Sequence, residues 1–221
     1  MKDCLFFKQL NKRKDKGTTL VEMVVSFTLL AIFVSVSVVI ISNVTVLYYR
    51  VRGESYARQV GDIITNKVAS EISGAQYSVK NTESNFIIES SSDFKTRIND
   101  EGKDYTLLKN FNESIDGNVV TLYDRTNTRI SVYSSKGIMN ILYYPIKDET
   151  VDDQSRDREP IIWTFDDKIY NGYFIESMQF SKADSNEYPP NIVVLNMKLK
   201  SNKYGEFDIC RYIKMYNYPD N

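Results

Sequence analysis

The sequence predicts an α+β protein in which one long N-terminal helix, first transmembrane and then amphipathic, packs on an antiparallel β-sheet domain. The run from Met23 to Ile41 carries no charge and is about the length needed to cross a ~30 Å hydrocarbon core as a helix. Apolar residues then recur at three- and four-residue steps as far as Ile72, which is the pattern of an amphipathic helix. Beyond residue 76 they occur in short alternating runs, which are typical of strands.

Residues 1–17 form a basic leader ahead of the apolar run. The leader has six basic and two acidic side chains, a net charge of +4. A basic flank stays on the cytoplasmic side of a membrane, so the chain after the span should lie outside. The run is too long for the core of a secretory signal peptide, and no small-x-small cleavage site follows it. We therefore expect a single-pass protein of the cytoplasmic membrane with an external C-terminal domain.

One acid, Glu22, lies at the start of the apolar run. An ionisable side chain at the edge of a membrane span is costly to bury, which indicates a functional role and a partner cation. If the chain is cut just ahead of the span, the new α-amine of a neighbouring subunit can be that cation. The pair would then set the register between packed helices. The alternative is an ordinary signal anchor whose glutamate lies at the membrane interface.

Residues 16–22 (KGTTLVE), between the leader and the span, resemble the N-terminal signal of type IV prepilins and pseudopilins. The layout of the chain is most similar to that of the larger minor pilins. The resemblance implies that a membrane-embedded prepilin peptidase cuts between Gly17 and Thr18 and methylates the new N-terminus at Thr18. It makes Glu22 the fifth residue of the mature chain and the residue that sets the assembly register. The family usually has Phe or Met where this chain has Thr18.

The helix is expected to run over residues 18–75, with a transmembrane half that ends at about residue 49. Gly53 and Gly61 are its weak points, since glycine costs up to about 1 kcal/mol relative to alanine in a helix. Gly74 is a suitable C-terminal stop. The buried stripe of the amphipathic half is predicted to consist of Tyr56, Val60, Ile63, Ile64, Val68 and Ile72.

Residues 76–221 are expected to form an external, β-rich globular domain. Its clearest feature is a hairpin, in which residues 191–200 and 206–216 flank the turn-forming segment 201–205. In the second strand several side chains compete for the inward positions, which allows a bulge near Cys210. The other predicted strands are 85–89, 118–123, 130–133, 139–144 and 161–165.

Composition argues against an enzyme and against cofactor binding. The chain has no histidine, and so lacks the usual general base at neutral pH and the commonest zinc ligand. Its 28 basic and 29 acidic side chains argue against direct nucleic-acid binding, which needs a basic surface. Cys4 leaves with the leader, so Cys210 has no partner for a disulfide within the mature chain.

The acidic segment 148–159 contains the only metal candidates, Asp152, Asp153 and Asp157, and they are weak ones. The segment lacks the spacing and the glycine of an EF-hand loop, so a solvated loop is the better interpretation. The sixteen tyrosines are interpreted mainly as strand residues that pack the sheet faces, with an exposed adhesive cluster as the alternative.

The favoured function is that of a minor structural subunit of a type IV pilus-like filament on the bacterial surface. The partners implied by the resemblance are the prepilin peptidase, other pilin subunits, the cytoplasmic membrane and the pilus assembly platform. One alternative is a pseudopilin of a secretion or DNA-uptake machine, which shares the same N-terminus. An alternative of another class is a signal-anchored extracellular sensor or binding protein.

Overall fold

The computed structural model divides into two compact units, with the boundary between Tyr49 and Arg50. Helix α1 (Leu20–Gly74) contributes its first part to one unit and its second part to the other. The residues that the structure describes are 19–75, 86–101, 105, 107–108, 111–124, 128–145, 159–184, 187–189 and 191–216.

The first unit is described from Thr19 to Tyr49, and its large apolar side chains are all exposed, from 45% at Tyr49 to 81% at Leu20. An 18-residue window of α1 has a mean hydropathy of 2.8 and no buried residue. By length and composition α1 is therefore able to act as a membrane anchor, consistent with a single-pass membrane protein.

Five serine and threonine hydroxyls in this part of α1 are satisfied by the helix itself. Each donates a hydrogen bond of 2.7–2.8 Å to the backbone carbonyl four residues earlier. Such bonds let serine and threonine lie in an apolar setting without a partner from another helix. The residues concerned are Ser26, Thr28, Ser35, Ser37 and Thr45.

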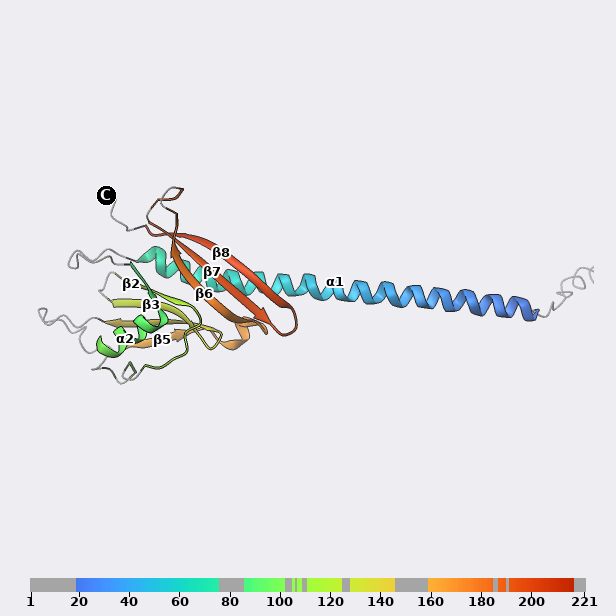
Figure 1. Cartoon of the computed structure of the whole chain (residues 1–221), viewed down its shortest axis with the longest axis horizontal. Helices are drawn as coiled ribbons and strands as arrows, with labels where there is room; N and C mark the ends of the chain where they lie inside the picture. Colours follow the sequence, from blue (N-terminus) through green and yellow to red (C-terminus); the bar gives the residue numbers. More distant parts are fainter. Residues whose placement is uncertain are drawn as a thin grey trace, which may run out of the picture. The chain divides into compact units, whose positions relative to one another are not determined.

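In the second unit the described residues form two antiparallel sheets, a five-stranded one in the order β1-β2-β3-β4-β5 and a three-stranded one in the order β6-β7-β8 (Figure 1). The fold is thus α+β with antiparallel sheets, as the sequence predicts. The strands are β1 (Phe86–Ser90), β2 (Asn118–Tyr123), β3 (Thr128–Ser135), β4 (Ile138–Pro145), β5 (Ile161–Thr164), β6 (Phe174–Lys182), β7 (Ile192–Ser201) and β8 (Gly205–Lys214).

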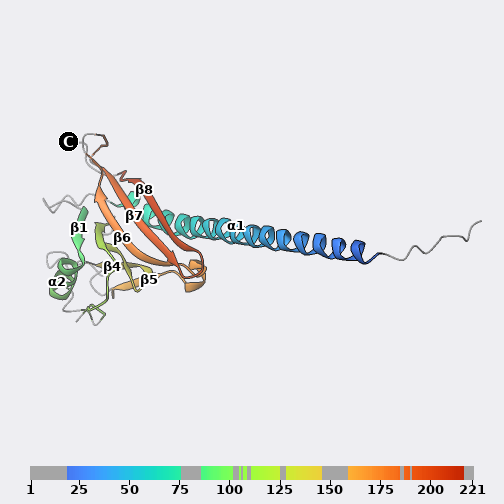
Figure 2. The ribbon, with the colours of Figure 1, turned by 45° about the vertical axis from the view of Figure 1, so that its right-hand side comes forward.

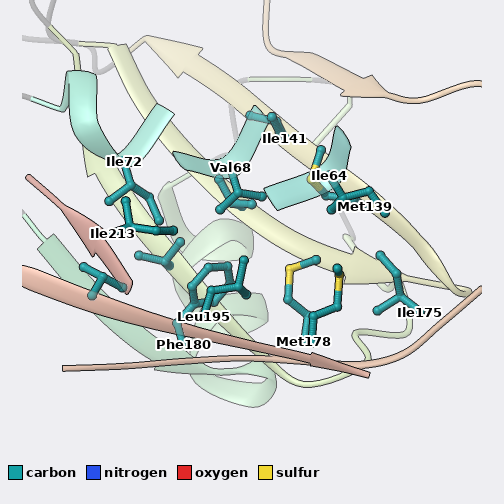
Figure 3. Packing of buried hydrophobic residues seen from close by; sticks show 14 of the residues in the cluster. Ile64, Val68, Ile72, Met139, Ile141, Ile175, Met178, Phe180, Leu195 and Ile213 are labelled. Carbon is teal, nitrogen blue, oxygen red and sulfur yellow. The ribbon is translucent and has the colours of Figure 1, made fainter. Parts of the chain in front are cut away.

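The second part of α1 lies against both sheets and supplies the centre of the main core. Figures 1 and 2 both show the three-stranded sheet crossing this part of the helix. Ile64, Val68 and Ile72 are fully buried and pack with residues of β2, β3 and β4 as well as with β6, β7 and β8 (Figure 3). The amphipathic pattern in the sequence therefore corresponds to a helix with one side covered by two sheets.

The buried side of the helix differs from the prediction at Ile63, which is 43% exposed. Successive helix residues are rotated by about 100°. The buried side extends from Ile64 toward Thr65, and Ile63 is rotated from Ile64 in the opposite direction, so its side chain is turned away from the core. Ile64 takes the buried position, and Tyr56 is only partly buried. The predicted stripe omitted four residues that the structure buries, namely Gly53, Ala57, Gly61 and Thr65.

Gly53 and Gly61 are places where the backbone of α1 approaches the β7–β8 hairpin closely. A Cβ atom added at Gly53 would lie 2.7 Å from Cβ of Tyr204. The Cβ atom of Tyr204 is bonded to the backbone, so only a backbone shift could relieve this clash. A Cβ atom added at Gly61 would lie 2.1 Å from Cδ1 of Ile209, the free end of a flexible side chain. The two glycines are thus contact positions as well as weak points of the helix.

Replacing these glycines by alanine should have unequal effects on stability. We expect Gly53→Ala to lower the free energy of unfolding by about 1–3 kcal/mol through overpacking. Gly61→Ala should cost less, because a side-chain rotation relieves the clash and alanine gains up to about 1 kcal/mol of helix propensity. Gly74→Ala is the control, since its Cβ would meet nothing within 4 Å. Urea unfolding of residues 50–221 measures all three, and equal stability of the Gly53 and Gly74 variants would contradict the packing argument.

A second helix, α2 (Ser91–Glu101), covers the opposite face of the five-stranded sheet and was not predicted. Its pattern is weak, because only Phe94 and Ile98 are apolar in an otherwise polar segment. Ser90 begins the helix, since its Oγ accepts the backbone N–H of Asp93 at 3.2 Å. The side chains of α2 pack in a second core with β2, β3 and β4, so these strands are buried on both faces.

The predicted strands are confirmed to within a few residues at their ends, although residue 85 lies outside the described residues and Phe165 lies outside β5. The prediction of a bulge near Cys210 is wrong. Strands β7 and β8 pair without a shift in register, and Asn196 lies opposite Cys210. Regular alternation is possible because Arg211, on the α1 side of β8, donates a hydrogen bond of 3.2 Å to Asn66. The irregularity lies in β6 instead, between Ile175 and Ser177.

Candidate assembly site at the start of the helix

Thr19 and Glu22 form a reciprocal cap at the first turn of α1. The backbone N–H of Thr19 donates to Oε2 of Glu22 at 2.8 Å, and the backbone N–H of Glu22 donates to Oγ1 of Thr19 at 3.3 Å. This arrangement is a capping box, which satisfies two N–H groups that the helix itself leaves without acceptors. The spacing T-x-x-E at residues 19–22 was a signal for it that the interpretation of Glu22 did not use.

The cap leaves Glu22 able to bind a cation as well. An ionised carboxylate can accept about four hydrogen bonds, and the described residues supply one, to Oε2. Glu22 is exposed, and its charge lies in the first helical turn, where the helix dipole favours an acid. The carboxylate is therefore held in place by its own helix and turned toward the surroundings.

The remaining predicted sites are placed only in part. Gly17 and Thr18, and the metal candidates Asp152, Asp153 and Asp157, lie outside the described residues. Within the part of the chain that the structure describes, no group of three or more His, Cys, Asp or Glu side chains is arranged to hold a metal ion.

A shallow groove of about 320 Å³ lies on the outer face of the three-stranded sheet, where exposed Cys210 is found. Sequence reasoning missed this groove, because its polar residues alternate with core residues along three separate strands. The groove is a solvated sheet face without a recognisable catalytic grouping. It is lined by Ser177, Gln179, Asn196, Met197, Lys198, Asp208, Ile209 and Cys210.

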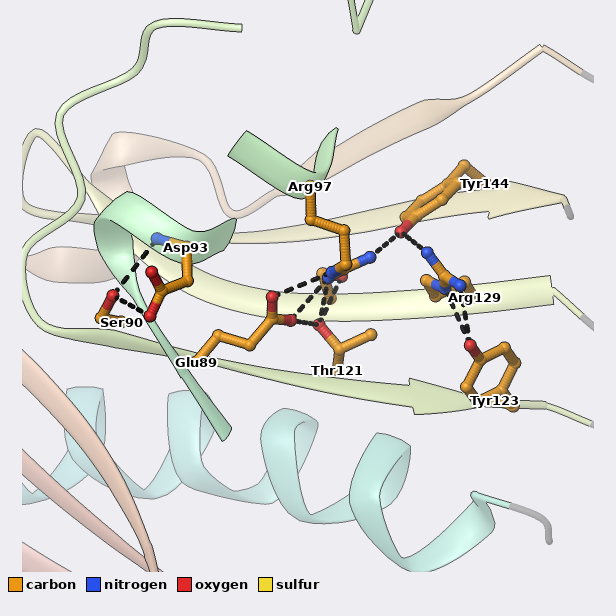
Figure 4. A network of polar contacts seen from close by, with 9 residues as sticks. Glu89, Ser90, Asp93, Arg97, Thr121, Tyr123, Arg129 and Tyr144 are labelled. Atoms are coloured by element: carbon orange, nitrogen blue, oxygen red, sulfur yellow. Dashed lines mark hydrogen bonds and ion pairs between the residues drawn. The ribbon is translucent and has the colours of Figure 1, made fainter. Parts of the chain in front are cut away.

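A polar network joins α2 to the five-stranded sheet (Figure 4). Arg97 of α2 donates to both carboxylate oxygens of Glu89 at 2.6 and 2.9 Å, to the Tyr144 hydroxyl at 2.6 Å and to Thr121 Oγ1 at 3.0 Å. The side chains of Arg97 and Glu89 are only 17% and 8% exposed. Burial by itself would lower the pKa of Arg97, but the hydrogen bonds and charge of Glu89 and Tyr144 raise it above its ordinary value.

Arg129 of β3 extends the network to a second tyrosine. It donates to the hydroxyl of Tyr144 at 2.8 Å and to that of Tyr123 at 2.8 and 3.1 Å. Its guanidinium carbon also lies 5.2–5.3 Å from the centres of both rings, within the range of a cation–π interaction. The network therefore ties α2 to the five-stranded sheet through Arg97, Tyr144 and Arg129.

Several tyrosines have a structural role of the kind that the sequence predicts. The hydroxyl of Tyr170 accepts the backbone N–H of Met139 at 2.7 Å, and burial raises the pKa of Tyr170 to about 12. Tyr143 donates to Glu71 at 2.8 Å, which ties β4 to α1. In contrast, Tyr212 is 52% exposed.

No protein-family model matches this chain, and no curated protein matches it significantly.

Proposed function

We propose that this chain is a minor structural subunit of a type IV pilus-like filament, made as a membrane prepilin and assembled by packing of its N-terminal helix. The observation that carries the proposal is the first part of α1. Its apolar side chains are all exposed, and it opens on the capped acid Glu22 a few residues after the Gly17–Thr18 junction. This combination fits a helix that exchanges a lipid environment for a protein one.

The energetics support a role for Glu22 in that exchange. The exposed apolar side chains cannot remain in water, because each large one gains roughly 1.5–3 kcal/mol on burial. Lipid tails and neighbouring helices are similarly apolar, so the hydrophobic effect does not by itself favour the filament over the membrane. A specific polar contact is needed to favour assembly, and a charge pair between Glu22 and the α-amine of a neighbour is such a contact.

The second unit contributes the external part of the subunit. It has two cores, one around α1 and one under α2, and needs no internal disulfide. The ion pair of Arg97 and Glu89 is enclosed within it rather than presented to a substrate. We infer that the unit acts through its surface, as a structural head.

Processing by a prepilin peptidase tests the proposal directly. When the two proteins are co-expressed, we expect mass spectrometry to show a mature N-terminus at Thr18. Gly17→Leu should abolish the cut, because a large side chain blocks access to the backbone at the membrane face. Lys12→Gln, elsewhere in the leader, is the control and should still be cut. A wild-type chain that stays full-length beside an active peptidase would refute the proposal and favour the signal-anchored binding protein.

A further inference from the structure

The tip of the β7–β8 hairpin is fixed against α1 at the beginning of the second unit. Tyr204 of the tip lies so close to Gly53 that no side chain fits between them. The Tyr204 ring stacks on that of Tyr173 at 6.0 Å and meets that of Tyr56 edge-on at 6.0 Å. The Tyr173 hydroxyl donates to the carbonyl of Gly53 at 2.9 Å. These contacts fix the tip at the level of Gly53 along the helix.

That level corresponds to one surface of a membrane when α1 spans it. Residues 23–49 carry no charge, and at 1.5 Å per residue they extend about 40 Å, close to the 40–45 Å thickness of a bilayer with its headgroups. If Glu22 lies at one surface, Arg50 lies at the other. Gly53 is only about 5 Å further along the axis. The hairpin tip is therefore within reach of the lipid headgroups.

The chemistry of this surface matches anionic headgroups. Arg50, Arg52 and Lys203 are exposed, and Glu54 is the one acid within residues 50–56 and 202–204. Lys203 Nζ lies 5.1 Å from the centre of the Tyr204 ring, and Arg52 lies 5.2 Å from that of Tyr56. Basic side chains beside tyrosine rings are typical of membrane interfaces, where the rings lie at headgroup level and the cations attract anionic lipids.

We propose that the surface formed by Arg50, Arg52, Lys203 and Tyr204 binds anionic phospholipid headgroups of the outer leaflet while the subunit waits in the membrane. The proposal rests on the membrane step of the proposed function. Lipid binding would hold the second unit close to the membrane. Extraction of the subunit into a filament would break this contact with the headgroups.

Depth-dependent quenching tests the contact in the full-length protein. A fluorophore is attached to Asn202→Cys in a Cys4→Ser, Cys210→Ser background, in vesicles with or without phosphatidylglycerol in phosphatidylcholine. We expect lipids with a quencher on the headgroup to quench this probe strongly, and more so with phosphatidylglycerol. A probe at Tyr216→Cys, beyond the far end of β8, is about 36 Å away along the strand and should be quenched weakly. Equal quenching at the two positions, or no effect of phosphatidylglycerol, would overturn the proposal.

Charge reversal separates lipid binding from mere proximity. Lys203→Glu should lower the population of the bound tip about fivefold or more, as expected for lost attraction of a cation to an anionic surface. Lys214→Glu, at the other end of β8, should change nothing, and an equal loss in both variants would overturn the assignment to this surface. A probe at Leu30→Cys with an acyl-chain quencher reports insertion. If that probe is not quenched, the membrane step of the proposed function fails, and the lipid contact fails with it.

Discussion

A chain that begins at Gln76 is expected to be insoluble, whereas one that begins at Arg50 should be a soluble, folded unit. The reason is that Val60, Ile64, Val68 and Ile72 are 0–2% exposed and lie in the core between two sheets. Each such side chain is worth roughly 1.5–3 kcal/mol when buried. Their combined loss is comparable to the whole net stability of a domain, about 5–15 kcal/mol. Circular dichroism and gel filtration of the two fragments provide the measurement.

A matched pair of neighbouring residues makes this test specific. In the fragment of residues 50–221, Ile64→Asp buries an unpaired charge and should unfold the domain. Ile63→Asp alters the adjacent residue by the same change, but Ile63 is 43% exposed and the variant should remain folded. A folded domain beginning at Gln76, or an Ile64→Asp fragment as stable as its Ile63→Asp counterpart, would show that α1 is not the centre of the core.

The Glu22→Ala variant should still be cut after Gly17 and still insert in the membrane, yet enter filaments poorly. In the proposed filament the substitution would leave a terminal amine without its counter-charge in an apolar setting. Breaking a buried pair by deleting one partner typically costs about 3–5 kcal/mol. In the membrane the cost should be smaller, since Glu22 would lie at the interface and mainly a helix cap would be lost, worth about 0.5–2 kcal/mol. The measurement is the ratio of sheared-filament to membrane-bound protein.

Two further variants separate the charge of Glu22 from its capping role. Glu22→Gln keeps an acceptor for the Thr19 N–H and removes the charge, so it should assemble as poorly as the alanine variant. Thr19→Ala removes the other half of the capping box and keeps the charge, so it should assemble nearly normally. Normal incorporation of Glu22→Gln would show that Glu22 acts as a cap alone. Cleavage is checked in the same samples.

The long helix and the final hairpin were predictable because their signals are local and repeated. The first part of α1 is a continuous apolar run, its second part repeats apolar residues at three- and four-residue steps, and β7 alternates along most of its length. Helix α2 was missed because a short helix with Phe94 and Ile98 as its apolar residues has almost no periodicity to detect. The division of the strands into two sheets was missed as well, because a strand buried on both faces, such as β2, has no alternation that assigns it to one layer.

At the candidate site, too, the features that depend on neighbouring residues could be predicted from the sequence, and those that depend on residues far apart in the chain could not. Glu22 stands out as an acid beside an apolar run, and even its cap is encoded within residues 19–22. The surface at the hairpin tip could not be predicted, because Gly53 and Tyr204 are far apart in the chain and each has an ordinary local role, one as a helix weak point and the other as a turn residue. Only the tertiary structure shows that Gly53, which has no side chain, makes room for Tyr204.

The way the second part of α1 is attached to the sheets has a mechanical consequence. Three polar contacts join the helix to different strands or loops along its length: Gly53 to Tyr173, Asn66 to Arg211 and Glu71 to Tyr143. A pull along the helix axis would load these contacts and the buried apolar row together, so that they share the force. Strands at a sheet edge, pulled from one end, instead separate one pair at a time. A subunit built in this way should transmit tension through its helix while the head remains folded.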